Sequence, residues 1–385
     1  MRMTQLKTIA DIQTGPFGSQ LHKEDYVESG TPIVTVEHLG NRVFTEQNLP
    51  RVSDCDKARL IKYTLSTGDI VFSRVGSVDR CSYVDKSHDG WMFSGRCLRV
   101  RPTELVDSLY LYYYFCLEET KQFVRNIAVG ATMPSINTKL LGEVEIALPD
   151  LKNQKRIAAV LSSLDDKIEN NQKLNDNLQQ QAMALYAEMF LNSSDNNVTS
   201  GTLSDIAAIT MGQSPSGSSY NEDGVGEVFY QGRAEFGFRF PKRRLFTTEP
   251  KRMAETGDVL LSVRAPVGDL NIAYERCCIG RGLGAIHSKT GHSSFVLYTM
   301  FALRSQLDVF NGEGTVFGSI NRDALNAIPI DIPPVTEIDQ FEVVAHPIDE
   351  LIRANYEENC RLEAIRDSLL PKLMSGEIDV SAVQL

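Results

Sequence analysis

Short apolar runs bounded by clusters of Gly, Pro, Asn and Asp fill two separate stretches of the chain. The first stretch holds TPIVTV, DIVFSRV and EVEIAL, and the second holds EVFYQG, DVLLSVRA and AIPIDI. Runs of this length and spacing predict β-strands. In each stretch one longer apolar segment, at 109–127 and at 293–310, interrupts the strands and is typical of a helix. The pattern predicts two mixed α/β domains.

A different pattern follows each stretch. Apolar residues recur there with alternating spacings of three and four, which is the heptad seam of a helix that packs on another helix. The first seam runs through Ile157, Leu161, Leu164, Ile168, Asn171, Asn175, Leu178, Ala182, Leu185 and Met189. The same positions in the second copy are Phe341, Ala345, Ile348, Ile352, Asn355, Asn359, Leu362, Arg366, Leu369 and Leu373.

Both seams carry two asparagines at matching positions, Asn171 and Asn175 in the first, Asn355 and Asn359 in the second. A buried Asn fixes the register of a coiled coil, because a shifted partner leaves its amide unsatisfied. The matched pairs favour two helices that pack on each other as an antiparallel coiled coil, with one domain at either end. The alternative is two amphipathic helices on separate cores.

Pro347 falls inside the second seam, where Ser163 stands in the first. A proline in a helix interior removes a hydrogen bond and kinks or breaks the helix. The second helix is therefore expected either to bend at this position or to begin near it, with proline in its first turn.

The two halves of the chain are copies of one arrangement. LKTIADIQTG aligns with LSDIAAITMG, GDIVFS with GDVLLS, GRCL with GRGL, and VGATMPSIN with EGTVFGSIN. We therefore predict an α+β fold with a pseudo-two-fold internal repeat. Its segments are a first mixed domain (1–150), a first long helix as coiled-coil spacer (151–195), a second mixed domain (196–334) and a second such helix (335–385).

Composition narrows the class of protein. No apolar run reaches the roughly 18 residues that span a membrane, and the N-terminus has no apolar signal core. The seven cysteines have irregular spacing, which favours reduced thiols in the cytoplasm over a disulfide framework or a zinc site. Cys277 and Cys278 are expected in a strand with one of them buried. The net charge is −11, but residues 335–385 hold 11 acidic against 4 basic residues, so a local basic face on each domain remains possible.

Two like domains at a fixed separation would suit a polymer with two half-sites, and duplex DNA is the obvious candidate. The candidate contacts in the repeated loop are Thr132, Ser135 and Asn137, and again Ser319 and Asn321. Hydroxyl groups and backbone amides bind phosphate oxygens without reading sequence, as a contact shared by both halves should. The alternative is that each asparagine caps the helical turn that follows it.

Arginines supply the other candidates. Arg74 and Arg264 follow the repeated strand, and Arg96 and Arg281 follow matching glycines, so we expect a basic face shared by both domains, with intramolecular salt bridges as the alternative. The cluster GRAEFGFRFPKRR exists only in the second half and is a candidate for reading guanine, or else a solvated basic hairpin. Its candidate residues are Arg233, Arg239, Lys242 and Arg243. Loops after the first strand of each half add Ser19, Gln20, His22, Gln213, Ser216 and Tyr220 as possible readers of bases.

Together these motifs resemble the specificity (S) subunit of type I restriction–modification systems. The marks are GATMPSIN, LPDLKNQKRIAAVLSSLDDKIE and LLPKLMSGEI, with their order and repetition across nearly the whole chain. The resemblance implies a non-catalytic, DNA-binding subunit that reads a bipartite double-stranded site, one half per domain. It also implies partners: two modification (methyltransferase) subunits that carry S-adenosylmethionine, and restriction subunits. No cofactor or metal is expected in this chain.

Catalytic alternatives lack their motifs. The sequence has no (N/D)PP(Y/F) motif of an amino-methyltransferase and no GxxxxGK(S/T) phosphate loop, and its six histidines are scattered. This disfavours a fused methyltransferase–specificity polypeptide. The remaining rival is a scaffold protein whose duplicated domains bind proteins and whose coiled coil only spaces them.

Overall fold

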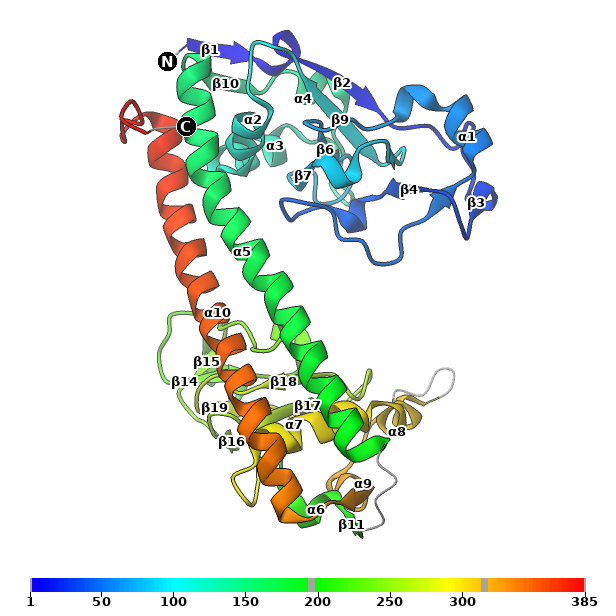
Figure 1. The fold of residues 1–385 in the computed structure, drawn as a ribbon. Coiled ribbons are helices and arrows are strands. Elements are labelled where there is room, and N and C mark those ends of the chain that lie inside the picture. The colour runs from blue at the N-terminus through cyan, green and yellow to red at the C-terminus, as the bar shows by residue number, and fades with distance from the viewer. Residues whose placement is uncertain (1, 193–197, 313–317, 384–385) are drawn as a thin grey trace. The chain divides into compact units, whose positions relative to one another are not determined.

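The computed structural model describes residues 2–192, 198–312 and 318–383. The chain forms two compact units, Met1–Asn171 with Glu358–Leu385 (unit 1) and Gln172–Glu357 (unit 2) (Figure 1). Residues 313–317, which include Gly314 of the second repeated loop, lie outside the described residues.

Unit 1 is built on a four-stranded antiparallel sheet. Its order is β2 (Ala10–Thr14), β9 (Cys97–Pro102), β6 (Ile70–Ser73) and β7 (Cys81–Tyr83). A second sheet has the order β3 (Tyr26–Val27), β5 (Arg51–Val52), β4 (Thr31–Val34) and β8 (Met92–Phe93), and β1 (Arg2–Gln5) pairs with β10 (Glu145–Leu148). The shorter helices are α1 (Asp54–Arg59), α2 (Ser108–Cys116), α3 (Glu118–Ile127) and α4 (Thr138–Leu141).

Both faces of the central sheet are covered, which explains why its strand β6 is buried at every position. Ile70 and Phe72 face the core formed with α2, where the rings of Phe72 and Phe115 lie 4.7 Å apart. Val71 faces the opposite way and joins the core of the second sheet. Alternate residues of one strand therefore serve two separate cores. In Figure 1, α2 and α3 lie on one side of β6 and β9.

Unit 2 repeats this arrangement. The central sheet has the order β12 (Ala207–Met211), β20 (Leu283–Ser288), β17 (Val259–Ser262) and β18 (Leu270–Ile272). The second sheet has the order β13 (Tyr220–Asn221), β15 (Phe246–Thr247), β14 (Glu227–Tyr230), β19 (Cys277–Ile279) and β16 (Met253–Ala254). β11 (Thr199–Thr202) pairs with β21 (Pro329–Ile332), and the shorter helices are α6 (Leu203–Ile206), α7 (Ser293–Ala302), α8 (Arg304–Asp308) and α9 (Arg322–Asn326). The fold class is therefore the predicted one.

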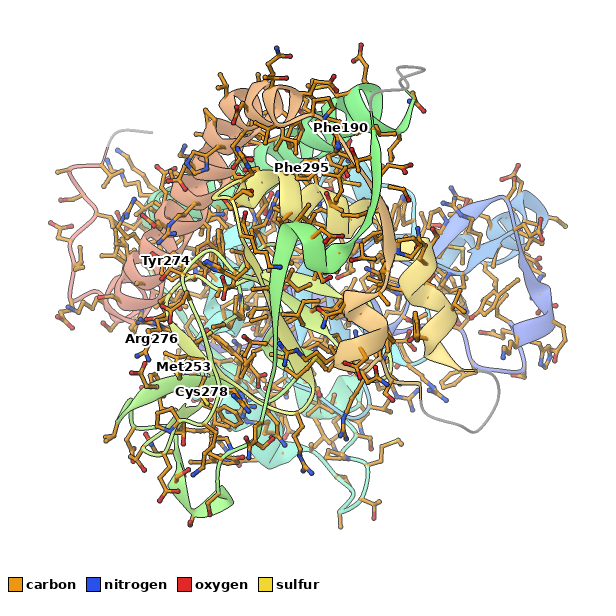
Figure 2. The ribbon with its side chains drawn as sticks, turned by 90° about the horizontal axis from the view of Figure 1, so that it is seen from below. Phe190, Met253, Tyr274, Arg276, Cys278 and Phe295 are labelled. Carbon is orange, nitrogen blue, oxygen red and sulfur yellow. The ribbon has the colours of Figure 1, made fainter. Side chains whose placement is uncertain are left out.

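The expectation for the two adjacent cysteines of β19 is wrong in one respect, because both Cys277 and Cys278 are fully buried. β19 lies inside its sheet, between β14 and β16, where Cys278 pairs with Met253 (Figure 2). Burial raises the pKa of the Cys277 thiol to about 12, and that of Cys97 in unit 1 likewise, so both are neutral near pH 7.

Two long helices complete the units: α5 (Leu151–Tyr186), followed by a π-helical turn (Ala187–Leu191), and α10 (Val335–Ser375). In unit 1, Ile157 and Leu161 of α5 share a core with Leu370 and Leu373 of α10. In unit 2, Tyr186 packs on Phe341, and Phe190 of the π-helical turn packs on Phe295 with ring centres 5.4 Å apart (Figure 2). In both units the helices run antiparallel, since low numbers of one meet high numbers of the other.

The asparagines of the seam lie in this helix pair. In unit 1 the Asn171 side chain donates to Asn359 at 2.8 Å, and in unit 2 Asn355 donates to Asn175 at 2.8 Å. All four side chains are buried. Next to the first pair, Asn171 and Lys167 lower the pKa of the Glu358 carboxyl group by hydrogen bonding to it. Each amide therefore meets the amide of the facing helix.

The second helix neither begins at Pro347 nor is broken by it. α10 begins at Val335 and continues through Pro347 to Ser375, so the alternative of a start near the proline is wrong. Pro347 is exposed, on the side of the helix away from the seam. The carbonyl of Val343, which loses its helical partner, is on an exposed residue that water can reach.

Candidate nucleic-acid interface

In unit 1 the repeated motifs meet where β6 ends and β9 begins. The amide of Arg74 donates to the carbonyl of Arg96 at 2.8 Å, and the amide of Ile136 donates to the carbonyl of Arg74 at 2.9 Å. Gly76 donates to Pro134 at 2.8 Å, and Gly15 donates to Cys97 at 3.2 Å. These bonds hold the loop after β2, the two arginines and the loop at 129–137 together at one edge of the central sheet.

Unit 2 has the same backbone bonds at its own strand ends. Gly212 donates to Leu283 at 2.9 Å, Val263 to Gly282 at 2.9 Å, Ile320 to Val263 at 3.1 Å and Ala265 to Gly318 at 3.0 Å. The edge encloses an open hollow of about 750 Å³, which we call the arginine hollow. Its lining includes Gly212, Arg264, Arg281, Ser319 and Asn321.

Among the described residues, no carboxylate lines the arginine hollow. Arg264 and Arg281 are exposed, and no ion pair among the described residues involves either of them. Its remaining lining side chains are apolar or uncharged. An uncompensated pair of guanidinium groups in such a recess is suited to bind an anion such as a phosphodiester.

The predicted correspondence between the arginines of the two halves is wrong by one residue. Ser73 pairs with Cys97 and Ser262 with Leu283, so Arg74 corresponds to Val263, and Val75 to Arg264. In the same register Gly95, not Arg96, corresponds to Arg281. Since side chains of an extended strand alternate between its faces, one step turns a side chain to the other side. The basic face is therefore not shared at equivalent positions.

The asparagines of the repeated loop cap helices, as the alternative interpretation had it. The Asn137 side chain accepts from the amide of Leu140 at the start of α4, and Asn321 accepts from Ala324 at the start of α9, both at 2.9 Å. The Ser135 hydroxyl donates to the carbonyl of Val129 at 3.1 Å, whereas Thr132 and Ser319 are exposed. Capping uses the single side-chain oxygen of each asparagine, so the exposed hydroxyl groups of Thr132 and Ser319 are left for a ligand.

The basic cluster of the second half separates into paired and buried residues. Arg233 forms an ion pair with Asp269, Arg243 forms one with Glu275, and Lys242 is exposed. Arg239 is different, because its side chain is 3% exposed and lies 3.2 Å from Asp349. It also donates to the hydroxyl of Tyr298. A residue held inside unit 2 cannot reach a base, so the assignment of Arg239 as a reader is corrected here.

The candidate residues in the loops after the first strands differ in how far they are exposed. Ser19, His22, Gln213 and Ser216 are exposed. Gln20 accepts from the Tyr63 hydroxyl at 2.7 Å, which leaves its amide nitrogen unused by that bond. Tyr220 is half-buried, with its ring 4.9 Å from that of Phe229 and its hydroxyl donating to Pro215. Tyr220 is therefore turned into the domain.

Phe17 lies exposed at this edge of unit 1 and was not among the residues predicted to contact DNA. Phe17 is 55% exposed and carries the guanidinium group of Arg74 5.8 Å from its ring centre. The signal was present in the sequence, as an aromatic residue between two glycines in GPFG. Sequence reasoning missed it because an isolated phenylalanine is more often part of a core.

The described parts of the chain lack a membrane-spanning helix, a cluster of metal ligands and a disulfide. There, no helix is both long and apolar enough to cross a membrane, and no cluster of three or more His, Cys, Asp or Glu side chains could hold a metal ion. The seven cysteines, all described, form no disulfide.

Known proteins share this arrangement. The family described as type I restriction modification DNA specificity domain matches residues 1–180 and 196–359. A chain of Methanocaldococcus jannaschii, provisionally named type I restriction enzyme MjaX specificity subunit, is 30% identical over 98% of this chain and 93% of its own length. The MjaIX specificity subunit of the same organism is 26% identical over 72% of this chain and 71% of its own length.

A solved structure agrees with the fold. The type I restriction–modification S subunit of M. genitalium superposes with a TM-score of 0.59 and 17% identity, over 97% of this chain and 95% of that one. The two copies of the matching family domain begin at the start of each half, as the internal repeat predicts. Members of the family are DNA recognition subunits that are not themselves catalytic. The chain thus belongs to the specificity subunits of type I restriction–modification systems.

Proposed function

We propose that each unit of this chain reads one half of a bipartite double-stranded DNA site through the edge where its repeated loop meets its central sheet. The observation that carries this proposal is the arginine hollow of unit 2. Two exposed guanidinium groups meet there without a carboxylate partner among the described residues, on a chain with a net charge of −11, and such a pair favours an anionic ligand.

Within this proposal, Arg264 and Arg281 contact the DNA backbone and hold the domain in register. Base reading falls to exposed side chains outside the hollow, because contacts to phosphate position a protein on DNA without carrying sequence information. In unit 2, Arg233 and Arg243 are the candidates. Their ion pairs with Asp269 and Glu275 are partly exposed, so a guanine can replace the carboxylate at small cost.

We further propose that the long helices dock two modification subunits, which carry S-adenosylmethionine, and that restriction subunits add to that complex. Exposed apolar side chains on α10, among them Val343, Val344 and Leu351, support a docking face. The chain itself contributes no chemistry, since its sequence lacks the methyltransferase and phosphate-loop motifs. A cytoplasmic location fits this role.

An exchange of domains tests the division of labour. Residues 201–334 are replaced by the equivalent segment of a relative with a different target, and the complex with modification subunits is mapped by methylation sequencing. One half of the recognised sequence should change while the other is retained. A change of both halves, or of neither, contradicts two independent readers. Assembly with subunits but no specific DNA binding by the unaltered chain would favour the scaffold alternative.

A further inference from the structure

The Phe17 ring of unit 1 is displayed by a backbone that cannot move far. The carbonyl of Phe17 accepts from the amides of Gln20 at 2.8 Å and Leu21 at 3.2 Å. Behind it, Gly15 and Gly95 bring two chain segments into contact. A Cβ atom on Gly15 would lie 2.1 Å from the carbonyl oxygen of Ser94, and one on Gly95 would lie 2.2 Å from that of Pro16. The exposed ring is therefore held in place from behind.

Arg74 fixes the ring from the side. Its Nη1 donates to the carbonyl of Gly95 at 3.0 Å, and its guanidinium carbon lies 5.8 Å from the ring centre, within range of a cation–π contact. No ion pair among the described residues involves Arg74, so its positive charge is uncompensated. The pair offers a flat apolar surface beside a positive charge, on the edge that carries the repeated loop.

Duplex DNA has one apolar group on the floor of its major groove, the C5-methyl group of thymine. Resting on the proposed function, we propose that Phe17 reads a thymine in the half-site of the first domain by packing its ring on that methyl group. Arg74 is a positioning residue that holds the ring and lowers the energy of placing it among phosphates. Insertion of the ring between base pairs is disfavoured, because the charged guanidinium group would have to follow it into the stack.

Unit 2 supplies an internal comparison. Gly15 and Gly212 donate to equivalent strand residues, Cys97 and Leu283, so the position of Phe17 corresponds to Ser214 and that of Arg74 to Val263. Ser214 accepts from the amide of Arg281 at 3.2 Å and presents no apolar surface. The methyl contact is thus a property of the first half-site alone.

Replacing thymine by deoxyuridine removes only the methyl group and tests the contact directly. The complex with modification subunits is bound to its mapped recognition duplex, with each thymine replaced in turn. One replacement in the first half-site should weaken binding about 4-fold, the effect of one buried methyl group. Phe17→Ala should bind the thymine and deoxyuridine duplexes equally, and Phe17→Leu should keep part of the difference.

The matched control is Phe123→Ala, an exposed phenylalanine on α3 of the same unit, 42% exposed and outside the edge. It should keep the full sensitivity to deoxyuridine, and thermal melting should show all three variants to be folded. The proposal is overturned by a first half-site that contains no thymine, or by equal thymine sensitivity with and without the ring. It is also overturned if Phe17→Ala weakens binding to every duplex equally and abolishes a DNA bend. If the thymine contact is overturned but the complex still binds specifically through the second half-site, the proposed function stands. If the proposed function itself is wrong, the complex shows no specific binding to any duplex.

Discussion

Residues of the same type have different roles in this chain, and their surroundings decide which. Arg239 and Arg264 both come from stretches that suggested DNA contact. Arg239 is buried beside Asp349, whereas Arg264 lines a recess without carboxylates. The guanidinium group of Arg239 is committed to the fold, and that of Arg264 is available to a ligand.

The arginine hollow is therefore expected to bind phosphate irrespective of sequence. Arg264→Ala and Arg281→Ala should each weaken the complex on specific and non-specific duplexes alike. The slope of log affinity against log salt concentration should fall by about 0.9 for each lost phosphate contact. Arg276→Ala is the control, because Arg276 is an exposed arginine already paired with Glu227 and Glu255 (Figure 2). An unchanged slope in both hollow variants would exclude the hollow as a phosphate site.

Removing Arg239 should affect stability and not specificity. Arg239→Ala leaves the Asp349 carboxylate without its cation in a largely buried site, which typically destabilises a protein by about 3–5 kcal/mol. The thermal midpoint should therefore drop strongly, and Asp349→Asn in the same chain should recover part of the loss. The half-site sequence methylated by the surviving complex should stay the same. If the Arg239→Ala variant kept its full stability but accepted other half-site sequences, Arg239 would be a base-reading residue after all.

At the scale of the element, the helices were the most predictable part of the molecule. Every residue of the two predicted seams is buried or half-buried, because the three-and-four spacing follows directly from helix geometry. The pairing of the strand ends could not be derived in the same way. Matching GRCL to GRGL by identity placed Arg96 opposite Arg281, whereas the hydrogen bonds place Gly95 there. Register depends on backbone partners far apart in sequence, which a one-residue slip in an alignment does not reveal.

The facing asparagines should be energetically coupled. Asn359→Leu alone removes one of the two acceptors of the buried Asn171 amide and leaves only Glu358, at a cost of about 1–3 kcal/mol. Asn171→Leu in the same chain removes the unsatisfied group and should recover much of that stability. Combining Asn359→Leu with Asn175→Leu, which belongs to the other layer, should instead add a second loss. Denaturant unfolding of the unaltered chain, of Asn359→Leu, of Asn171→Leu and of their combination gives the coupling energy, and additive losses for Asn171 with Asn359 would contradict the pairing.

Replacing Pro347 is expected to raise the stability of the chain, in contrast to the substitutions above. It interrupts the hydrogen bonding of α10 at an exposed position, where no packing contact offsets the interruption. Proline is up to about 3 kcal/mol less favourable than alanine inside a helix. Pro347→Ala should therefore raise the thermal midpoint of the chain. Pro371→Ala, a second exposed proline of the same helix, should act in the same direction, and a lower midpoint in both variants would indicate that the prolines have a packing role.

At the scale of the whole molecule, the chain order and the folded units do not coincide. The end of α10, Glu358–Leu385, belongs to unit 1 together with the N-terminal residues. Leu370, Leu373 and Met374 share the core of that unit with Ile157 and Leu161. Truncation before residue 358 would therefore expose the core of the first domain, although it removes only the end of the chain. Each half of the sequence repeat depends on a helix segment from the other half.

This antiparallel arrangement determines how a change of spacer length must be designed. If the helices set the distance between the half-sites, one added heptad in each should lengthen the spacer by about 10 Å. That corresponds to roughly 3 base pairs of B-DNA, with a rotation between the grooves of about 100°. Since Asn171 faces Asn359 and Asn175 faces Asn355, insertions after Asn175 and before Asn355 keep both pairs in register. Insertions after Asn175 and after Asn359, which the sequence repeat would suggest, fall on opposite sides of the two layers and separate both pairs.

Methylation mapping of the two double-insertion variants shows whether the helices set the distance between the half-sites or only connect the two domains. The variant with matched layers should keep both half-site sequences and select a longer spacer between them. The variant with separated layers should unfold at a lower temperature and methylate poorly, because four buried amides lose their partners at once. Full activity of the matched variant on the original spacer would show that the helices connect the two readers without setting their distance, since about two extra turns in each helix would then have no effect on the DNA that the complex selects.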